Sequence, residues 1–299
     1  ALCGAGHDRH ASLGHCAMAT RLGTRAGRLT AARALRSVKG RREQRRFAFE
    51  GATLLEEAVA ASFPIAEVYA SQSAYDATPL LHELEARETP VFILSGNAIG
   101  AISDVATPSG IVVVAPMRLV TPQAFIGSDR SLVLADLNDP SNAGTLLRSA
   151  DAFGTAGVVF GSLGVDPYHP KVVRGSMGAI FRLSIAVAQP DETAAAAAAA
   201  GAGMLGLAAG GTPLAAERFA PPVALVVGHE RRGLGPWERH CKRLLAIPMY
   251  GPAESLSAAV AGSIALYEAA GAQTCQDSLL SQKSQDYRAK KSHGTIRRR

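Results

Sequence analysis

The fold of this chain is constrained most by a series of short, nearly unbroken apolar runs that alternate with helical patterns in its second half. The clearest runs are Leu132–Leu137, Val158–Phe160, Val223–Val227 and Leu244–Ile247. Strands that helices cover on both faces are apolar throughout, whereas strands with one wet face alternate between apolar and polar residues. We therefore predict an α/β fold with a mainly parallel sheet over residues 131–273. Its other strands are predicted at Leu183–Val187 and Met204–Ala208, and its helices at Asn142–Phe153, Tyr168–Gly175, Glu192–Ala200 and Ser255–Ala270.

A second, shorter alternation precedes this domain. It predicts a small α/β domain over residues 29–117. Residues 118–130 contain Pro122 and Gly127 and are predicted to be a linker. A chain of 299 residues is long enough for two such domains. The small domain is predicted to have helices at Thr30–Lys39, Leu54–Val59, Pro79–Arg87 and Ala98–Ile102, and strands at Arg46–Phe49, Ile65–Ala70, Val91–Leu94 and Ile111–Val114.

Both ends of the chain are basic. Residues 1–46 carry 11 Lys and Arg against two acids, and residues 275–299 carry seven against two, while the whole chain has a net charge of +6. Basic ends on an acidic body suit a polyanion such as a nucleic acid, although solvated termini explain such runs equally well. We predict a disordered basic extension at residues 1–28 and a disordered basic tail at residues 274–299.

The sequence also indicates which compartments and partners to expect. Its four cysteines have no tight spacing, which indicates a reducing compartment without a disulfide framework. No segment has the pattern of a membrane span or a secretory signal. We expect a cytoplasmic protein without a membrane partner, or an organellar matrix protein if residues 1–28 are a transit peptide. His82, His229 and His240 do not form a ligand set, so we expect no metal.

One glycine pattern invites a different interpretation. Residues 201–206 match the G-x-G-x-x-G string of dinucleotide-binding folds. That string binds a pyrophosphate when it follows a strand and opens a helix. Here it follows an Ala-rich helical pattern and opens a strand, so a helix C-cap with a tight turn explains the glycines better.

Three polar, Gly-containing segments each follow a short apolar run. They are residues 138–148, 228–235 and 247–257. In a parallel sheet the carboxyl ends of the strands lie at one edge, where α/β proteins bind their ligands. Together the three segments resemble the signature motifs of the SpoU (TrmH-like) branch of the SPOUT RNA methyltransferases. The resemblance implies an S-adenosylmethionine-dependent 2′-O-ribose methyltransferase with a trefoil knot near its C-terminus that forms a homodimer.

The first segment implies the catalytic residues. Asn142 and Arg148 match the family's N-x-G-x-x-x-R pattern, in which the Arg is the reactive residue. A guanidinium stays protonated at ordinary pH, so we favour a role in orienting the ribose hydroxyl and stabilising the developing alkoxide. The alternative is general-base catalysis, which would require the positive charge of Arg148 to be offset locally. Ser257 stands where the family usually has Asn, and it is the third catalytic candidate.

The second and third segments imply the cofactor site. Their glycines and apolar strand ends match the positions with which the family holds the methionine end and adenine of S-adenosylmethionine. This chain departs from the commoner family form at Arg231 and Arg232, which add positive charge at the mouth of the site. The resemblance assigns cofactor binding to Val227, Gly228, Ile247, Met249, Gly251 and Leu256.

The first domain carries a separate resemblance. Residues 38–42, 47–58 and 107–112 resemble the ribosomal-protein-L30e-like substrate-binding domain that is often fused to SpoU enzymes. The implied partner is structured RNA, most naturally a 23S-type rRNA. The alternatives are a tRNA methyltransferase and an RNA-binding assembly factor that has lost catalysis. Lys171 and Arg174 share a helix face and suit either an RNA phosphate or a salt bridge to a neighbouring helix. The expected RNA contacts are Arg41, Arg42, Arg45, Arg46, Lys171, Arg174 and Glu230.

Overall fold

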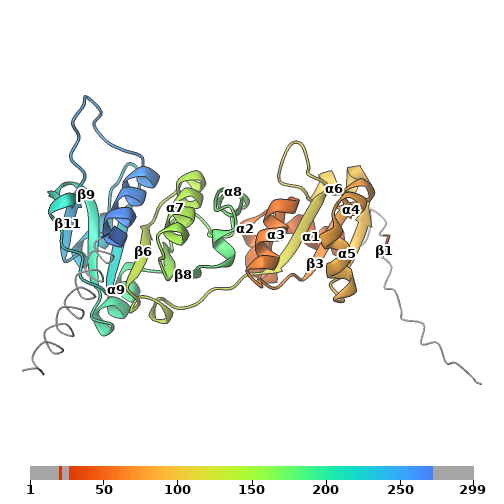
Figure 1. Ribbon diagram of the computed structural model, residues 1–299, viewed down its shortest axis with the longest axis horizontal. Coiled ribbons are helices and arrows are strands. Elements are labelled where there is room, and N and C mark those ends of the chain that lie inside the picture. The colour runs from red at the N-terminus through yellow and green to blue at the C-terminus, as the bar shows by residue number, and fades with distance from the viewer. Residues whose placement is uncertain (1–19, 22–26, 272–299) are drawn as a thin grey trace, which may run out of the picture.

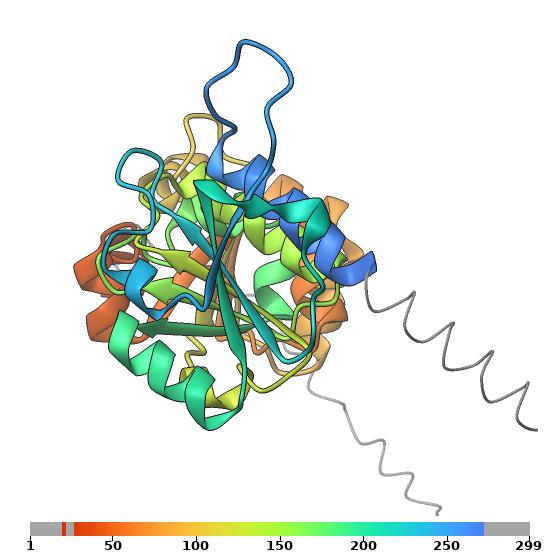
Figure 2. The ribbon, with the colours of Figure 1, turned by 90° about the vertical axis from the view of Figure 1, so that its left-hand side faces the viewer.

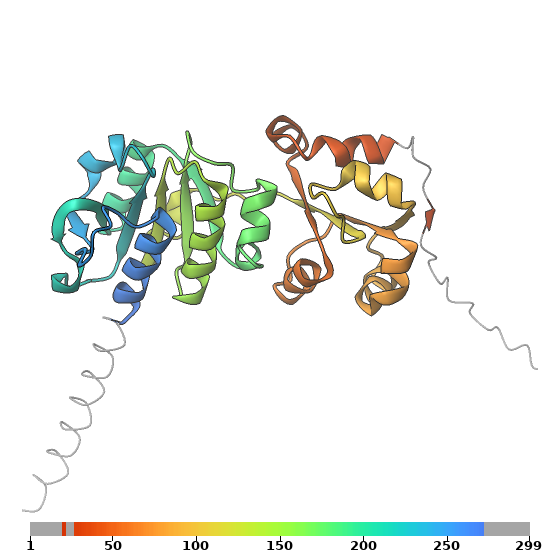
Figure 3. The same cartoon turned by 90° about the horizontal axis from the view of Figure 1, so that it is seen from above.

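The chain forms two α/β lobes that lie side by side along the long axis of the molecule (Figures 1 and 3). The computed structural model describes residues 20–21 and 27–271. The N-terminal lobe holds a five-stranded sheet with strand order β1-β4-β3-β5-β2. The C-terminal lobe holds a six-stranded sheet with strand order β11-β9-β10-β6-β7-β8. None of the helices in the described ranges is both long and apolar enough to cross a membrane.

The sheet of the N-terminal lobe is mixed. Strand β5 pairs antiparallel with β2 and β3, whereas β4 pairs parallel with β3 and β1. The strands are β1 (Thr20–Arg21), β2 (Arg46–Glu50), β3 (Glu67–Ser71), β4 (Val91–Leu94) and β5 (Ile111–Pro116). The helices are α1 (Gly27–Ala34), α2 (Val38–Gln44), α3 (Ala52–Ala60), α4 (Gln72–Ala77), α5 (Pro79–Ala86) and α6 (Gly96–Ile102).

Two predictions for this lobe are corrected by the structure. The helix expected at Thr30–Lys39 is two helices, because Ser37 has extended backbone dihedrals and its side chain accepts a hydrogen bond from the Gly40 N–H as the N-cap of α2. The extension predicted to be disordered at residues 1–28 contains strand β1 and the first residues of α1. The rest of that extension and the predicted tail at 274–299 lie outside the described residues.

The sheet of the C-terminal lobe is parallel, as predicted. Its strands are β6 (Arg130–Ala135), β7 (Gly157–Gly161), β8 (Ser184–Ala188), β9 (Gly203–Pro213), β10 (Val223–Gly228) and β11 (Arg243–Ala246). Its α-helices are α7 (Pro140–Ala152), α8 (Pro170–Gly175), α9 (Pro190–Ala199) and residues 258–271. Short 3-10 helices occur at η1 (Pro122–Ala124), η2 (Ala179–Phe181), η3 (Leu214–Ala216) and η4 (Gly235–His240).

Both faces of this sheet are covered, which explains the unbroken apolar runs. Leu132 and Leu134 of β6 join the core that contains α7 and residues 258–271, while Val133 and Ala135 join the core that contains α9 and Trp237. All four side chains are essentially inaccessible to solvent. Figure 2 shows helices on either side of the sheet.

Two parts of this lobe differ from the simple pattern. Strand β9 runs to Pro213, beyond the Ala208 predicted from its apolar run, and pairs with β11 through a register shift at Leu244/Leu245. The segment predicted to be a linker holds Phe125 and Ile126, which are buried in the core beside α9. Gly201 has a φ of +67° at the end of α9, as expected for a helix C-cap rather than a dinucleotide-binding loop.

Candidate active site

The three polar segments follow β6, β10 and β11, and all three begin at the carboxyl edge of the parallel sheet. The fold therefore brings together residues that lie about a hundred positions apart in the chain. The loop at residues 247–257 stands out from this edge at the top of Figure 2. Its Tyr250 side chain is almost wholly exposed.

The first and second segments are joined by hydrogen bonds to the side chains of Glu230 and His229. Asn142 Nδ2 donates to Glu230 Oε1 over 3.0 Å, and the Asp139 backbone N–H donates to the same oxygen over 3.4 Å. Asn138 Nδ2 lies 3.1 Å from His229 Nε2. Burial would raise the pKa of the Glu230 carboxyl, but the hydrogen bonds from Asn142 and from backbone N–H groups outweigh burial and lower it. Glu230 is thus held as a carboxylate that fixes the start of α7, whereas the sequence had suggested an RNA contact.

The turn of the second segment requires glycine at its base. His229 and Gly233 exchange two backbone hydrogen bonds of 2.9 Å, which closes the loop tightly over the end of β10. A Cβ atom on Gly228 would lie 2.5 Å from the Gly233 carbonyl carbon. A side chain at position 228 would therefore open the loop that holds Glu230.

A cavity of about 380 Å³ lies between the middle of β9, the end of β11 and the loop at 247–257. Three predicted cofactor residues line it: Ile247, Met249 and Leu256. The other three are not among its lining residues, and Val227 is a buried core residue of β10. The cavity is also lined by residues that were not predicted to bind the cofactor: Leu207, Ala208, Ala209, Leu245, Ala246, Pro248, Glu254, Ser255 and Ala261.

This lining suits a flat heteroaromatic group with a polar extension. Apolar side chains dominate it, and the strand ends contribute backbone donors and acceptors. Glu254 and Ser255 supply a carboxylate and a hydroxyl at its polar side. The contribution of β9 was missed because its apolar run carries no polar motif of its own. The only signal for it was the position of that strand beside β10 and β11, which the sequence does not show.

Arg148 lies on the exposed surface of α7. No hydrogen bond or ion pair connects its guanidinium to another residue of the described chain. Ser257 is exposed, and its hydroxyl accepts a hydrogen bond from the Val260 N–H over 3.3 Å, which caps the helix at 258–271. Asn142 is thus the only one of the three catalytic candidates that the described chain ties to another polar side chain of the site.

The predicted RNA contacts fall into two groups. Arg42, Arg45 and Lys171 are exposed, as an RNA contact requires. Arg46 is about half exposed and lies 3.9 Å from Glu67. Arg174 is also about half exposed and lies 3.5 Å from Asp104 in the loop after α6 of the other lobe, so it forms a salt bridge, although to a loop and not to the neighbouring helix considered as its alternative partner.

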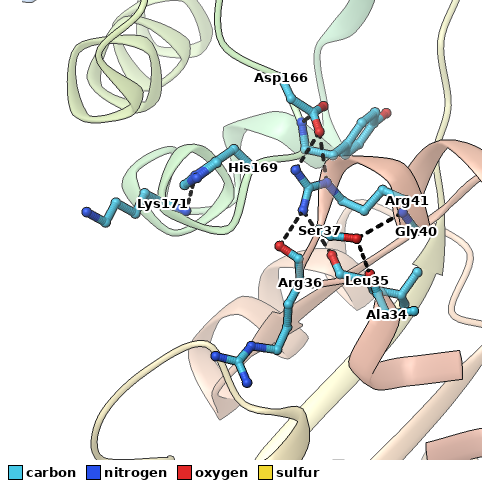
Figure 4. A network of polar contacts seen from close by, with 10 residues as sticks. Ala34, Leu35, Arg36, Ser37, Gly40, Arg41, Asp166, His169 and Lys171 are labelled. Atoms are coloured by element: carbon cyan, nitrogen blue, oxygen red, sulfur yellow. Dashed lines mark hydrogen bonds and ion pairs between the residues drawn. The ribbon is translucent and has the colours of Figure 1, made fainter. Parts of the chain in front are cut away.

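The prediction for Arg41 is wrong. Its side chain is only 1% exposed and forms an ion pair with Asp166 (Figure 4). A guanidinium enclosed in this way cannot reach an RNA phosphate. The basic character of residues 38–46 gave no sign that this arginine points inward.

No group of three or more His, Cys, Asp and Glu side chains in the described ranges could hold a metal ion.

Two protein-family models match the chain. The SpoU rRNA Methylase family matches residues 129–267, and the MRM3-like substrate binding domain matches residues 28–113. One relative, 23S rRNA (guanosine(2553)-2′-O)-methyltransferase RlmP of Bacillus subtilis, is 30% identical over 240 residues, which cover 79% of this chain and 93% of that protein.

Solved structures with a similar fold cover both lobes. The AdoMet-bound rRNA methyltransferase from Sinorhizobium meliloti has a TM-score of 0.75 and 27% identity and covers 84% of this chain and 97% of its own. The SpoU methyltransferase AviRb from Streptomyces viridochromogenes, in complex with AdoMet, has a TM-score of 0.74 and 26% identity and covers 84% of this chain and 99% of its own.

Proposed function

The chain belongs to the SpoU rRNA methylase family of RNA 2′-O-methyltransferases, and we propose that it methylates a ribose 2′-hydroxyl in 23S-type rRNA with S-adenosylmethionine as methyl donor. The observation that carries this proposal is the meeting of the three motifs at one sheet edge, beside a cavity of about 380 Å³. The relative RlmP, named for 23S rRNA and similar over nearly its whole length, supports this substrate.

The residues of the cavity fit the methyl donor. Ile247, Leu256 and the middle of β9 would enclose the adenine, because apolar walls and the backbone groups at the end of β11 match its flat face and its polar edge. Glu254 lies on the cavity wall and would contact a cationic or hydroxyl group of the donor. When bound, the donor supplies an activated methyl group.

Arg148 would act on the ribose hydroxyl. The guanidinium stays charged at neutral pH, so it orients the hydroxyl and stabilises the negative charge that develops on oxygen as the proton leaves. Its exposure leaves it accessible to a substrate. Asn142, held by Glu230 over 3.0 Å, fixes the first turn of the same helix.

The N-terminal lobe would hold the RNA. Arg42 and Arg45 of this lobe, with Lys171 of α8 in the C-terminal lobe, supply exposed positive charge for backbone phosphates, which give affinity without base specificity. We also propose the homodimer and the knot that the family implies. Val260 and Tyr267 are large exposed apolar residues on the helix at 258–271, and they support a pairing surface there.

The test of the reaction is methyl transfer from labelled S-adenosylmethionine to total rRNA. The wild type should label 23S rRNA at a ribose 2′-oxygen, and Arg148→Ala should lose at least about a hundredfold in rate because a charge-stabilising donor is gone. Arg87→Ala is the matched control, since Arg87 is an exposed arginine of the N-terminal lobe in a surface pair with Glu83. A wild-type protein that binds the donor but transfers nothing would favour the RNA-binding assembly factor instead.

The test of the cavity is a charge placed in its wall. Leu256→Glu should abolish donor binding and leave RNA affinity nearly unchanged. Leu163→Glu is the control, because Leu163 is 78% exposed and does not line the cavity. Equal loss of donor and RNA binding in Leu256→Glu would contradict the assignment of the cavity.

A further inference from the structure

Arg41 is a charged residue enclosed at the junction of the two lobes. Its Nε donates to Asp166 Oδ2 over 2.8 Å, and its Nη2 approaches the same oxygen at 2.6 Å, off the line of a hydrogen bond. Its Nη1 donates to the backbone carbonyls of Leu35 and Arg36 over 2.9 and 3.2 Å (Figure 4). Burying such a pair costs much of the free energy that its attraction returns, so overall stability is a poor explanation for it. The distinctive property of the Arg41–Asp166 pair is geometric, because it fixes the position of one lobe relative to the other.

Asp166 also connects the Arg41 contact to the start of helix α8. Its other oxygen, Oδ1, accepts a hydrogen bond from the Tyr168 backbone N–H over 3.0 Å, at the turn that leads into α8. The Tyr168 hydroxyl accepts from the Arg118 N–H and donates to the Arg118 carbonyl, both over 2.8 Å. The Tyr168 ring lies against Phe47 of β2, with 4.5 Å between the ring centroids. The start of α8 is therefore held by the N-terminal lobe and by Arg118, in the segment that connects this lobe to the C-terminal lobe.

Helix α8 in turn contacts α7 without side chains in between. A Cβ atom on Gly144 of α7 would lie 2.9 Å from Gly175 Cα and 3.0 Å from the Val172 carbonyl oxygen, both in α8. Two backbones that touch this closely cannot slide past each other by rotating a side chain. A shift of α8 would therefore move the part of α7 that carries Asn142 and Arg148.

A second ion-pair cluster connects the far end of α7 to the N-terminal lobe. Arg182 Nη1 donates to Glu57 Oε2 of α3 over 2.5 Å, and Arg182 Nη2 donates to Asp151 Oδ2 of α7 over 2.8 Å. Both carboxylates raise the pKa of the Arg182 guanidinium, and its hydrogen bond to Asp151 has the larger effect. The apolar neighbour of this cluster is Phe181, whose ring lies 5.0 Å from the ring of Phe49 in β2.

We propose that the Arg41–Asp166 pair and the Glu57–Arg182–Asp151 cluster position helix α7 relative to the N-terminal lobe, so that Arg41 and Arg182 are positioning residues for methyl transfer. The inference rests on the proposed function, because it assigns the N-terminal lobe to RNA and α7 to catalysis. A rigid junction places the bound RNA at a fixed distance from Arg148. The first contact acts on α7 through α8, which meets α7 at Gly144, and the second holds α7 at Asp151 near its C-terminal end, so together they fix the position of the helix at two points along its length.

The Glu57–Arg182–Asp151 cluster is partly exposed and offers the cleaner test, because substitution of the buried Arg41 can prevent folding. Glu57→Gln removes one charge with almost no change of shape. Glu56→Gln is the matched control, since Glu56 is the exposed neighbour on the same helix and forms no hydrogen bond or ion pair with the described residues of the C-terminal lobe. The measurement is the single-turnover rate of methyl transfer at saturating RNA and saturating S-adenosylmethionine.

Glu57→Gln should lower this rate roughly tenfold, because misplacement of a catalytic group by a fraction of an ångström is costly. The dissociation constant of S-adenosylmethionine should stay within about twofold, since Glu57 lies outside the cavity. Arg182→Lys should recover part of the rate lost in Arg182→Gln, because lysine keeps the positive charge but lacks the planar guanidinium that donates to both carboxylates. Equal rates for Glu57→Gln and Glu56→Gln, with only a lower melting temperature for Glu57→Gln, would overturn the positioning role.

Amide hydrogen exchange separates this inference from the proposed function, because it needs no activity. In Glu57→Gln, the amides of α7 should exchange faster than in Glu56→Gln, while those of β6 and β7 stay protected. If the wild type transfers no methyl group, the proposed function fails, and the exchange of α7 still decides whether the junction holds that helix. Unchanged exchange in α7 would overturn the inference even in an active enzyme.

Discussion

Replacing Gly144 with alanine should destabilise the protein, although alanine is the better helix former. Gly144 lies in the middle of α7, where alanine is favoured by about 1 kcal/mol over glycine. The added Cβ would lie within 3.0 Å of three backbone atoms of α8, namely Gly175 Cα, Gly175 C and the Val172 carbonyl oxygen. Backbone atoms cannot rotate out of the way, so the two helices must separate.

The magnitude follows from two opposing effects. Overpacking a well-packed contact costs about 1–3 kcal/mol, and close contact with three backbone atoms of α8 suggests the upper half of that range. The gain in helix propensity returns about 1 kcal/mol. The expected net loss in the free energy of unfolding is therefore about 1–2 kcal/mol. That loss corresponds to a fall of about 2–8 °C in melting temperature for a domain of this size.

The control for this change is Gly100→Ala. Gly100 lies in α6, and a Cβ atom there would meet nothing within 4 Å. That variant should be more stable than the wild type by about 0.4–1 kcal/mol. Both variants are measured by urea denaturation followed by far-UV circular dichroism. If Gly144→Ala gains stability as Gly100→Ala does, the close approach of α7 and α8 is not a rigid contact and the reasoning is refuted.

Three further outcomes are expected. Trp237→Phe should lower the free energy of unfolding by about 1.5–3 kcal/mol in urea titrations, because Trp237 Nε1 donates to the Asp136 carboxylate over 2.9 Å; a change near zero would contradict this. The pKa of Glu230 is lowered on folding, so its stabilising contribution is present above the unfolded pKa and is lost as pH falls through the folded value. The stability difference between wild type and Glu230→Gln should therefore be clear at pH 7 and shrink at pH 3, and a difference independent of pH would refute it. Burial, with a smaller effect of Glu238, raises the pKa of the Cys241 thiol to about 11. Its alkylation by iodoacetamide at pH 8, followed by peptide mass spectrometry, should be roughly a hundredfold slower than that of an ordinary thiol, and a rate like that of glutathione would exclude this.

The local sequence pattern was sufficient to predict those helices and strands whose bounds depend only on apolar runs and turn residues. Strand β4 occupies Val91–Leu94 as predicted, because the apolar run is bounded by Pro90 on one side and by Ser95, the N-cap of α6, on the other. The helix predicted at Thr30–Lys39 is two helices, because Ser37 caps the second one, and a single serine in a basic run does not reveal such a cap in the sequence. Strand β9 extends beyond its apolar residues because β11 pairs with it, and pairing partners are a tertiary property.

Local sequence patterns predict even less of the candidate site than of the fold. The motifs identify the loops at one sheet edge, because strand direction places them there. They do not identify the wall that β9 contributes to the cavity, because that wall is made by a strand without a motif. Nor do they reveal the role of Arg41, whose partner Asp166 lies 125 residues further along the chain. A basic run predicts positive charge, and whether that charge faces solvent or a buried carboxylate depends on the neighbouring lobe.

Ser257 is where the chain departs from the usual Asn of its family, and its observed contact limits what that departure can mean. Its hydroxyl caps the helix at 258–271, and Ser and Asn are about equally good N-caps, so the stability of the helix gives no reason to prefer either. The neighbouring Leu256 lines the cavity, so the cap also fixes where the chain leaves the donor site. Serine therefore preserves the helix cap beside the cavity proposed for the methyl donor. Among the described residues none forms a hydrogen bond or ion pair with Arg148, so in the proposed reaction we expect the RNA substrate to orient its guanidinium.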